Sequence, residues 1–172
     1  MRVLVSFIVC IGFLYSNSFK DIFSYKANFV QSIVNPSGSE VLYKGSLYIK
    51  KPSYIKWIYN SPVEKVVYIK NDKVTILEPE LEQVILTTLD KEIDILNLLK
   101  KSKKISKNQY EAKYNNTLYN ITIIDDKLTK ISYEDELENS ITINFDTIEQ
   151  NIKLPDYIFL CDIPYEYDII RK

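Results

Sequence analysis

The segment Gly45-Ser-Leu-Tyr-Ile-Lys-Lys-Pro52 alternates apolar and polar side chains and ends at a proline. Tyr54-Ile-Lys-Trp57 follows directly and continues the alternation with larger side chains. Further along, Glu78-Pro-Glu-Leu-Glu-Gln-Val84 places an acidic turn with a proline before another apolar run. A period of two predicts strands with one buried face, and proline is not found in the middle of a sheet. The three segments therefore predict consecutive antiparallel strands.

The same alternation recurs along most of the chain. The candidate strands are residues 25–34, 41–50, 54–59, 65–69, 74–77, 82–88, 109–114, 118–124, 128–134, 140–145 and 157–161, with turns at 35–38, 60–62, 71–72, 115–116 and 125–126. Many short strands at this spacing predict an antiparallel sandwich or barrel. Because the sequence has three glycines, we expect asparagine and aspartate to form most of the turns.

One segment, residues 90–104, departs from the strand pattern. Its apolar residues Ile93, Leu96 and Leu99 recur at helical spacing, and Asp90 can cap the first turn. Lysines at its end complement the helix dipole. We therefore expect an amphipathic helix over residues 90–104, and a second, short helical piece within residues 18–23.

Composition limits the classes of function. The 172 residues suffice for one domain with a full core, and 22 basic residues nearly balance 23 acidic ones. A nucleic-acid-binding protein would need a basic excess, so we expect no nucleic-acid partner. The sequence has no histidine, the residue most used for general-base catalysis and for catalytic zinc. We therefore expect no enzymatic activity, no metal and no cofactor.

The N-terminus has the features of a secretory signal. Arg2 precedes an uncharged apolar run over residues 3–15, and Ser16-Asn-Ser18 offers small residues for cleavage. We expect residues 1–18 to be removed, leaving residues 19–172 as one domain. The alternative is a buried N-terminal helix or strand. Cleavage removes Cys10 and leaves Cys161, which lies in an apolar stretch and is expected to be a small buried side chain.

In this order the motifs resemble the LolA family of periplasmic outer-membrane lipoprotein carriers. The matching residues are Phe29-Val-Gln31, residues 45–52, Ile55-Lys-Trp57, residues 79–84, and a tail over residues 159–164 and 167–170. The resemblance implies a mainly β fold with covering helices, namely an incomplete, unclosed antiparallel β-barrel with an α-helical lid. It also implies export to the periplasm.

The function implied by the resemblance is that of a carrier, or chaperone. Such a protein shields the acyl chains of lipoproteins and transfers them from the inner to the outer membrane. The implied partners are lipoproteins, an ATP-driven release complex of the inner membrane, and an outer-membrane receptor or the membrane itself. We expect the carrier to act as a monomer. Exposure of each acyl CH₂ to water costs about 0.8 kcal/mol, which explains why a carrier is needed.

The resemblance further implies an apolar cavity for acyl chains on the inner face of the sheet. The residues expected to line it are Phe29, Leu47, Ile49, Ile55, Trp57, Tyr59, Ile76, Val84 and Leu86. Ile93, Leu96 and Leu99 are expected to form the apolar side of the lid. Composition alone favours an alternative in which Trp57 fills a closed core, because aromatic side chains are most often buried.

Lys51 stands where the family usually has an arginine that hydrogen-bonds the lid. Strand alternation places Lys51 on the face of Leu47 and Ile49, so we expect it to point inward. Because lysine lacks the planar guanidinium, a latch at Lys51 would be looser. A strand-end lysine that reaches solvent is equally compatible with the sequence.

Two charged segments have an ordinary and a functional interpretation. Glu78, Glu80 and Glu82 could suggest acid–base catalysis or cation binding, but their place in a turn favours a solvated loop. The lysines within residues 100–107 could contact anionic lipid or an acidic partner, although a solvated helix end is the commoner role.

Two other classes of function remain open. The first is a lipid- or lipoprotein-sensing half-barrel domain of the cell envelope. The second is a secreted hydrolase that works with carboxylates, for which the sequence offers no clear set of catalytic residues.

Overall fold

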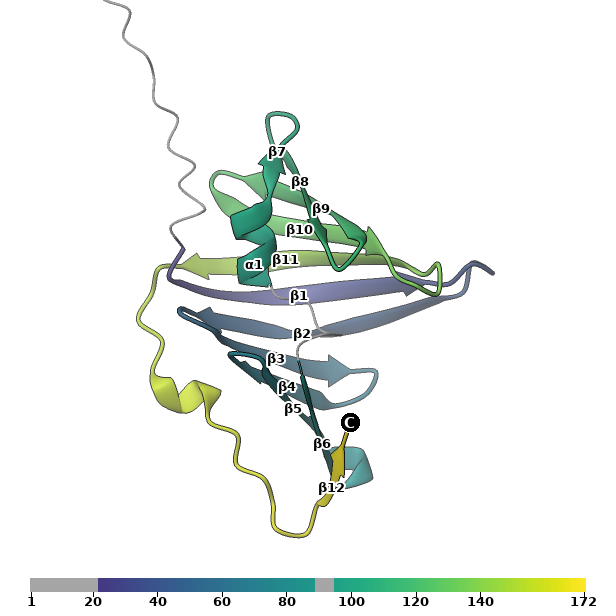
Figure 1. The fold of residues 1–172 in the computed structure, drawn as a ribbon, viewed down its shortest axis with the longest axis vertical. Coiled ribbons are helices and arrows are strands. Elements are labelled where there is room, and N and C mark those ends of the chain that lie inside the picture. The colour runs from purple at the N-terminus through teal and green to yellow at the C-terminus, as the bar shows by residue number, and fades with distance from the viewer. Residues whose placement is uncertain (1–21, 89–94) are drawn as a thin grey trace, which may run out of the picture.

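The computed structural model describes residues 22–88 and 95–172 (Figure 1). The predicted signal segment, most of the predicted short N-terminal helix, and Ile93 lie outside the described residues. Within them, the strands are β1 (Ser24–Val34), β2 (Glu40–Lys50), β3 (Tyr54–Ser61), β4 (Lys65–Lys70), β5 (Lys73–Glu78), β6 (Gln83–Thr88), β7 (Lys103–Lys104), β8 (Gln109–Tyr114), β9 (Thr117–Ile124), β10 (Lys127–Glu134), β11 (Ser140–Gln150) and β12 (Asp168–Arg171). The helices are η2 (Pro79–Leu81), α1 (Ile95–Lys101) and η4 (Asp156–Phe159).

All twelve strands belong to one curved sheet, in the order β12-β6-β5-β4-β3-β2-β1-β11-β10-β9-β8-β7. Strands β1 to β6 and strands β7 to β11 pair consecutively as antiparallel hairpins, and β1 joins these two halves because it pairs with both β2 and β11. The last strand, β12, pairs in parallel with β6. The edge strands β7 and β12 lie at opposite ends of this order, so the sheet does not close. The expected mainly β, unclosed architecture is confirmed.

Asparagine and aspartate form the tight turns, as expected from the scarcity of glycine. Asn71 has a φ of 58°, Asn115 and Asn116 have 46° and 66°, and Asp125 and Asp126 have 49° and 59°. These residues tolerate the left-handed region better than other non-glycine residues. The β4–β5, β8–β9 and β9–β10 hairpins therefore turn without glycine.

The helix is shorter than predicted at its C-terminal end. The structure places α1 at Ile95–Lys101, and the predicted residues 103–104 form strand β7 instead. The Ser102 hydroxyl donates to the carbonyl of Leu99 at 2.8 Å, which satisfies a free carbonyl at the helix end. Lys104 then pairs with Tyr110 of β8, so the edge of the sheet captures this segment. No helix of the described residues is long and apolar enough to span a membrane.

The predicted strand at residues 157–161 is wrong, and the 3-10 helix η4 takes its place. The Lys50 ammonium holds this segment, because it donates to the carbonyl of Leu154 at 2.7 Å and to Asp156 at 2.5 Å. Phe159 packs on Tyr54 with ring centroids 5.7 Å apart. These contacts hold the chain after β11 against β3, where it has no strand partner.

Candidate functional site

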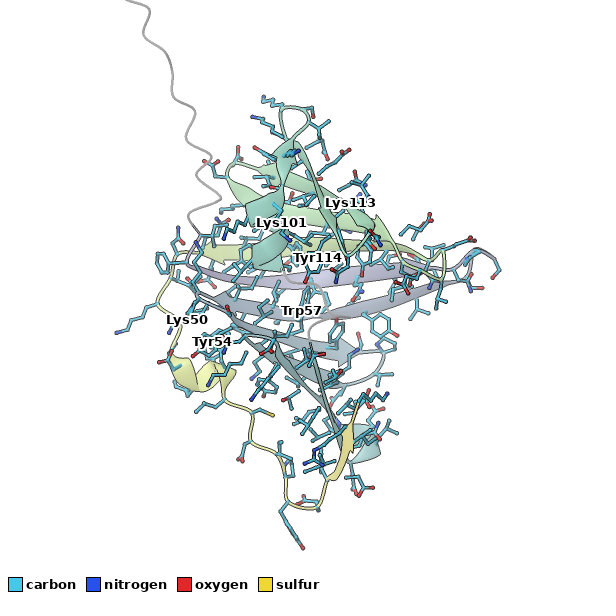
Figure 2. All side chains as sticks on the ribbon, viewed as in Figure 1. Lys50, Tyr54, Trp57, Lys101, Lys113 and Tyr114 are labelled. Atoms are coloured by element: carbon cyan, nitrogen blue, oxygen red, sulfur yellow. The ribbon has the colours of Figure 1, made fainter. Side chains whose placement is uncertain are left out.

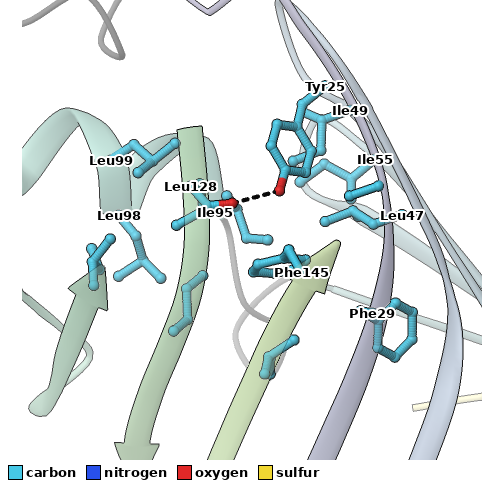
Figure 3. Close-up of a cluster of buried hydrophobic side chains, with 14 of the residues drawn as sticks. Tyr25, Phe29, Leu47, Ile49, Ile55, Ile95, Leu98, Leu99, Leu128 and Phe145 are labelled. Carbon is cyan, nitrogen blue, oxygen red and sulfur yellow. Dashed lines mark hydrogen bonds between the residues drawn. The ribbon is translucent and has the colours of Figure 1, made fainter. Parts of the chain in front are cut away.

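One face of the sheet carries a continuous apolar surface, which we call the concave face (Figure 3). Leu47 of β2 lies opposite Trp57 of β3, Trp57 opposite Val67 of β4, and Val67 opposite Ile76 of β5. Side chains opposite each other in paired strands share a face. By this register seven of the nine predicted cavity residues lie on the concave face: Phe29, Leu47, Ile49, Ile55, Trp57, Tyr59 and Ile76.

Aromatic rings run across this face in contact with one another. Phe29 lies edge-on to Trp57, with centroids 5.0 Å apart, and to Tyr59 at 5.1 Å. Trp57 stacks on Tyr59 at 6.2 Å, and Phe145 of β11 lies 6.4 Å from Trp57. Tyr25 lies edge-on to Phe145, with ring centroids 5.9 Å apart. The rings thus connect β3 with β11 across the middle of the sheet.

Gly45 makes this aromatic arrangement possible. A Cβ at this position would lie 1.8 Å from the carbonyl oxygen of Ile58 and 2.9 Å from Cε1 of Phe29. Phe29 lies directly opposite Gly45 in the β1–β2 pair, so its ring covers the space left by the missing side chain. The glycine therefore permits both the close approach of β2 to β3 and the position of Phe29.

Val84 and Leu86 do not belong to this surface, and their prediction as cavity residues was wrong. Val84 lies opposite Leu77, and Leu86 opposite Thr75, which places both on the convex face. Ile85 lies opposite Ile76 and takes the expected place. The cause is the β5–β6 turn, in which a 3-10 turn and Glu82 at a φ of 48° put four residues between the paired ends Glu78 and Gln83. Because four residues intervene, even-numbered residues of β5 pair with odd-numbered residues of β6. The prediction had assumed that even-numbered residues of both strands lie on the same face.

Helix α1 contributes its apolar side to the same core. Ile95 and Leu98 are fully buried, Leu99 is nearly so, and Leu96 is half-buried. Of the predicted lid residues, Leu96 and Leu99 therefore pack against the core. Ile95 and Leu98 are the most buried residues of the helix. Their spacing of three residues is the sequence signal that places both on the buried side of the helix. Helix α1 lies against β8.

In this structure the concave face is covered, because Leu47 is 0% and Trp57 4% exposed. The buried polar residues of the described chain are Ser24, Gln31 and Ser102, none of which is ionisable near neutral pH. Tyr25 donates its hydroxyl to the carbonyl of Leu128 at 2.8 Å across the face. Burial, and then the charge of Asp146, raise the pKa of this phenol well above its usual value. The concave face is therefore an apolar surface that contains a phenol held in its neutral form.

Lys51 does not point inward as alternation suggested. It lies in the turn after β2 and is exposed, and its backbone N–H donates to the carbonyl of Phe23 at 2.8 Å. The strand ends one residue earlier, so the alternation that would turn Lys51 toward Leu47 no longer applies. Its assignment as a latch stays a prediction.

Comparison with known proteins addresses the identity of the chain. A family model described as outer membrane lipoprotein carrier protein LolA matches residues 20–123. The chain belongs to the LolA family. A protein of Wolinella succinogenes, named outer-membrane lipoprotein carrier protein, is 37% identical over 166 residues, which cover 95% of this chain and 96% of the relative. A protein of Campylobacter jejuni with the same name is 36% identical over 148 residues, 86% of each chain.

Solved structures agree on the fold. A LolA superfamily protein from Nitrosomonas europaea superposes with a TM-score of 0.55 at 15% identity, covering 82% of this chain and 91% of the other. An uncharacterized conserved protein from Thermus thermophilus gives 0.56 at 8% identity, covering 89% and 93%. At these identities the likeness concerns the fold alone. The resemblance to LolA noted in the sequence is confirmed.

Proposed function

We propose that the protein is a periplasmic carrier that shields the acyl chains of lipoproteins and transfers them from the inner to the outer membrane. Membership of the LolA family supports this function, as do the names of the Wolinella and Campylobacter relatives. The observation that carries the proposal is the concave face itself. It is an open sheet whose inner surface is a connected set of aromatic and aliphatic side chains.

The concave face has the chemistry that acyl chains require. Each CH₂ removed from water stabilises the bound state by about 0.8 kcal/mol, so a surface without buried charge suffices to bind the chains. Phe29, Trp57 and Tyr59 supply broad apolar rings with few rotamers to fix. Binding and release need no covalent step, so the carrier does not act as an enzyme.

The covered state requires an opening step before cargo binds. Side chains at native packing density leave no room for an acyl chain beside Leu47 or Trp57. We assign the movable cover to α1, because Ile95 and Leu98 bury on the core from a helix of only seven residues. A short helix is marginal without its tertiary contacts, so it can leave the face at modest cost. A latch at Lys51 would act on this equilibrium.

The remaining parts of the proposal concern the route. The chain is exported after removal of residues 1–18 and works as a monomer in the periplasm. An ATP-driven complex of the inner membrane loads it, and an outer-membrane receptor or the membrane itself accepts the cargo. No cofactor or metal takes part.

The test is release of a triacylated lipoprotein from membranes into solution. Inner-membrane vesicles that carry the release complex are incubated with ATP and the purified protein, and soluble lipoprotein is measured after centrifugation. The informative variant is Tyr59→Gln, which places an amide on the concave face. Its matched control is Tyr48→Gln, because Tyr48 is also half-buried but lies opposite Lys56 on the convex face.

We expect the unchanged protein and Tyr48→Gln to release lipoprotein equally, and Tyr59→Gln to release much less. No soluble lipoprotein with the unchanged protein would reject the carrier function. Equal loss in both variants would mean that the concave face is not the binding surface.

A further inference from the structure

The strongest charged feature of the molecule lies at one edge of the sheet. Residues 100–107 read Lys-Lys-Ser-Lys-Lys-Ile-Ser-Lys and span the end of α1, strand β7 and the following loop. We call this segment the basic edge. No aspartate or glutamate occurs between residues 95 and 110, although the whole chain is nearly neutral. Five of the 22 basic residues of the chain therefore lie within the eight positions of the basic edge.

The lysines of the basic edge are exposed, and two of them lie over tyrosine rings. Lys101 holds its ammonium 5.0 Å from the ring centroid of Tyr114 (Figure 2). The ammonium of Lys104 lies 5.9 Å from the ring centroid of Tyr110. Neither of the two ion pairs in the described part of the chain includes a lysine of this segment. The acid on the adjoining strand is Glu111, opposite Lys103. The segment thus keeps a strong excess of positive charge.

An apolar side chain stands in the middle of these charges. Ile105 is 58% exposed. Its backbone N–H donates to the carbonyl of Gln109 at 2.9 Å, and the backbone N–H of Ser106 donates to the same carbonyl at 3.2 Å. These two hydrogen bonds hold the loop in this position. Single exposed apolar side chains are common on protein surfaces, and Leu137 is more exposed, but Ile105 has lysines on both sides in the sequence. The same arrangement suits a phospholipid surface, where lysines meet anionic headgroups and the apolar side chain enters the interface.

We propose that the basic edge docks the protein on membranes that contain anionic phospholipid. An acidic protein partner would match the charges but would leave Ile105 without a specific role. The location of the basic edge, at the end of α1, also suits the proposed carrier function. Lys100 and Lys101 end α1, whose other side covers the concave face, so docking brings the cover next to the bilayer.

The experiment measures binding of the purified, empty protein to vesicles without lipoprotein, so its outcome is independent of cargo transfer. Vesicles of phosphatidylcholine are compared with vesicles that also contain phosphatidylglycerol, at low and high salt. The test variant changes Lys100, Lys103 and Lys107 to glutamine. Its matched control changes Lys44, Lys73 and Lys172, which are also exposed but lie on β2, on β5 and beside β6, away from the basic edge.

We expect binding to the anionic vesicles, weakened by salt. The test variant should lose on the order of 100-fold in affinity, because each lysine near an anionic surface contributes about fivefold. The control triple variant should lose much less. Ile105→Gln should also weaken binding, whereas Leu118→Gln, an equally conservative change at a 50% exposed residue of β9, should not.

Three results would overturn the proposal. The first is absence of binding to the anionic vesicles, and the second is equal loss in the test and control triple variants. The third is equal loss of binding in Ile105→Gln and Leu118→Gln, which would leave the exposed isoleucine of the basic edge without a role.

Discussion

At the scale of single residues, Gly45 makes the strictest demand on side-chain size. We predict that Gly45→Ala destabilises the fold by about 3 kcal/mol or more, above the usual range for overpacking. The reason is that a Cβ would lie 1.8 Å from the carbonyl oxygen of Ile58, which is backbone and cannot move without opening the β2–β3 pair. Chemical denaturation of the purified variant measures the loss.

Gly38 provides the control for this substitution. It has a φ of +86° in the β1–β2 turn, and a Cβ there would meet nothing within 4 Å. Gly38→Ala should cost only about 1–2 kcal/mol, the strain of a left-handed backbone. If Gly45→Ala were no worse than Gly38→Ala, the close approach of β2 to β3 would be wrong.

Tyr25 couples stability to pH. Its phenol stays protonated in the fold because burial, and then Asp146, raise its pKa, whereas an unfolded phenol ionises near pH 10. The unfolded state therefore binds fewer protons above about pH 10, and this residue's contribution to stability falls as pH rises. We predict that Tyr25→Phe costs about 0.5–1.5 kcal/mol at neutral pH through the lost bond to Leu128. The difference between variant and parent should shrink by pH 11 in urea unfolding; a constant difference would contradict the raised pKa.

The sequence predicted single residues correctly where the conformation of the backbone depends on the residue itself. The turns at Asn71, Asn115 and Asp125 followed from the scarcity of glycine, because these residues accept positive φ. The inward orientation predicted for Lys51 assumed that β2 continues through it, whereas the end of a strand depends on its partners. The sequence alone does not show that β2 stops at Lys50.

At the scale of elements, helix α1 is the part to which we assign movement. We predict that Leu98→Ala lowers the melting temperature, with a loss of about 2–5 kcal/mol, and raises the apparent affinity for an acylated peptide by roughly tenfold or more. Weaker packing of the cover lowers the cost of opening. The control is Leu128→Ala, since Leu128 is equally buried but lies on strand β10.

Leu128→Ala should lower the melting temperature without raising the affinity. Affinity is compared per folded molecule, at a temperature well below both transitions. If the two variants changed affinity alike, α1 would be an ordinary part of the core and not a cover.

Most strands were predictable as elements because each shows its own alternation. The faces of β6 were not, since the four residues between Glu78 and Gln83 reverse the odd–even pattern and only the register reveals it. The segment around Phe159 has strand-like composition, yet Lys50 and Tyr54 hold it as a 3-10 helix. In that segment tertiary contacts override local propensity.

At the scale of the whole molecule, the predicted export defines the mature protein. We predict that the periplasmic form begins at Phe19, after cleavage behind Ser16-Asn-Ser18. Mass spectrometry of the protein recovered from the periplasm decides this. An intact Met1 on a membrane-bound form would contradict it.

The arrangement of the sheet could not be derived from local patterns. Pairing of β1 with β11 joins residues more than a hundred positions apart, for example Phe29 with Phe145, and no periodicity reports such a contact. The resemblance to LolA supplied the open-barrel architecture and, through it, the shared concave face. The aromatic contact between Trp57 and Phe145 exists only because of this long-range pairing.

The proposal that acyl chains lie on the concave face can be measured through Trp57, the single tryptophan. A lipopeptide whose acyl chains carry a nitroxide quencher is titrated against the protein, and binding is followed independently by ultracentrifugation. Because nitroxides quench at contact range, a chain on the concave face should strongly quench the emission of Trp57 in step with binding. The same lipopeptide bound without any quenching of Trp57 would show that the acyl chains lie elsewhere.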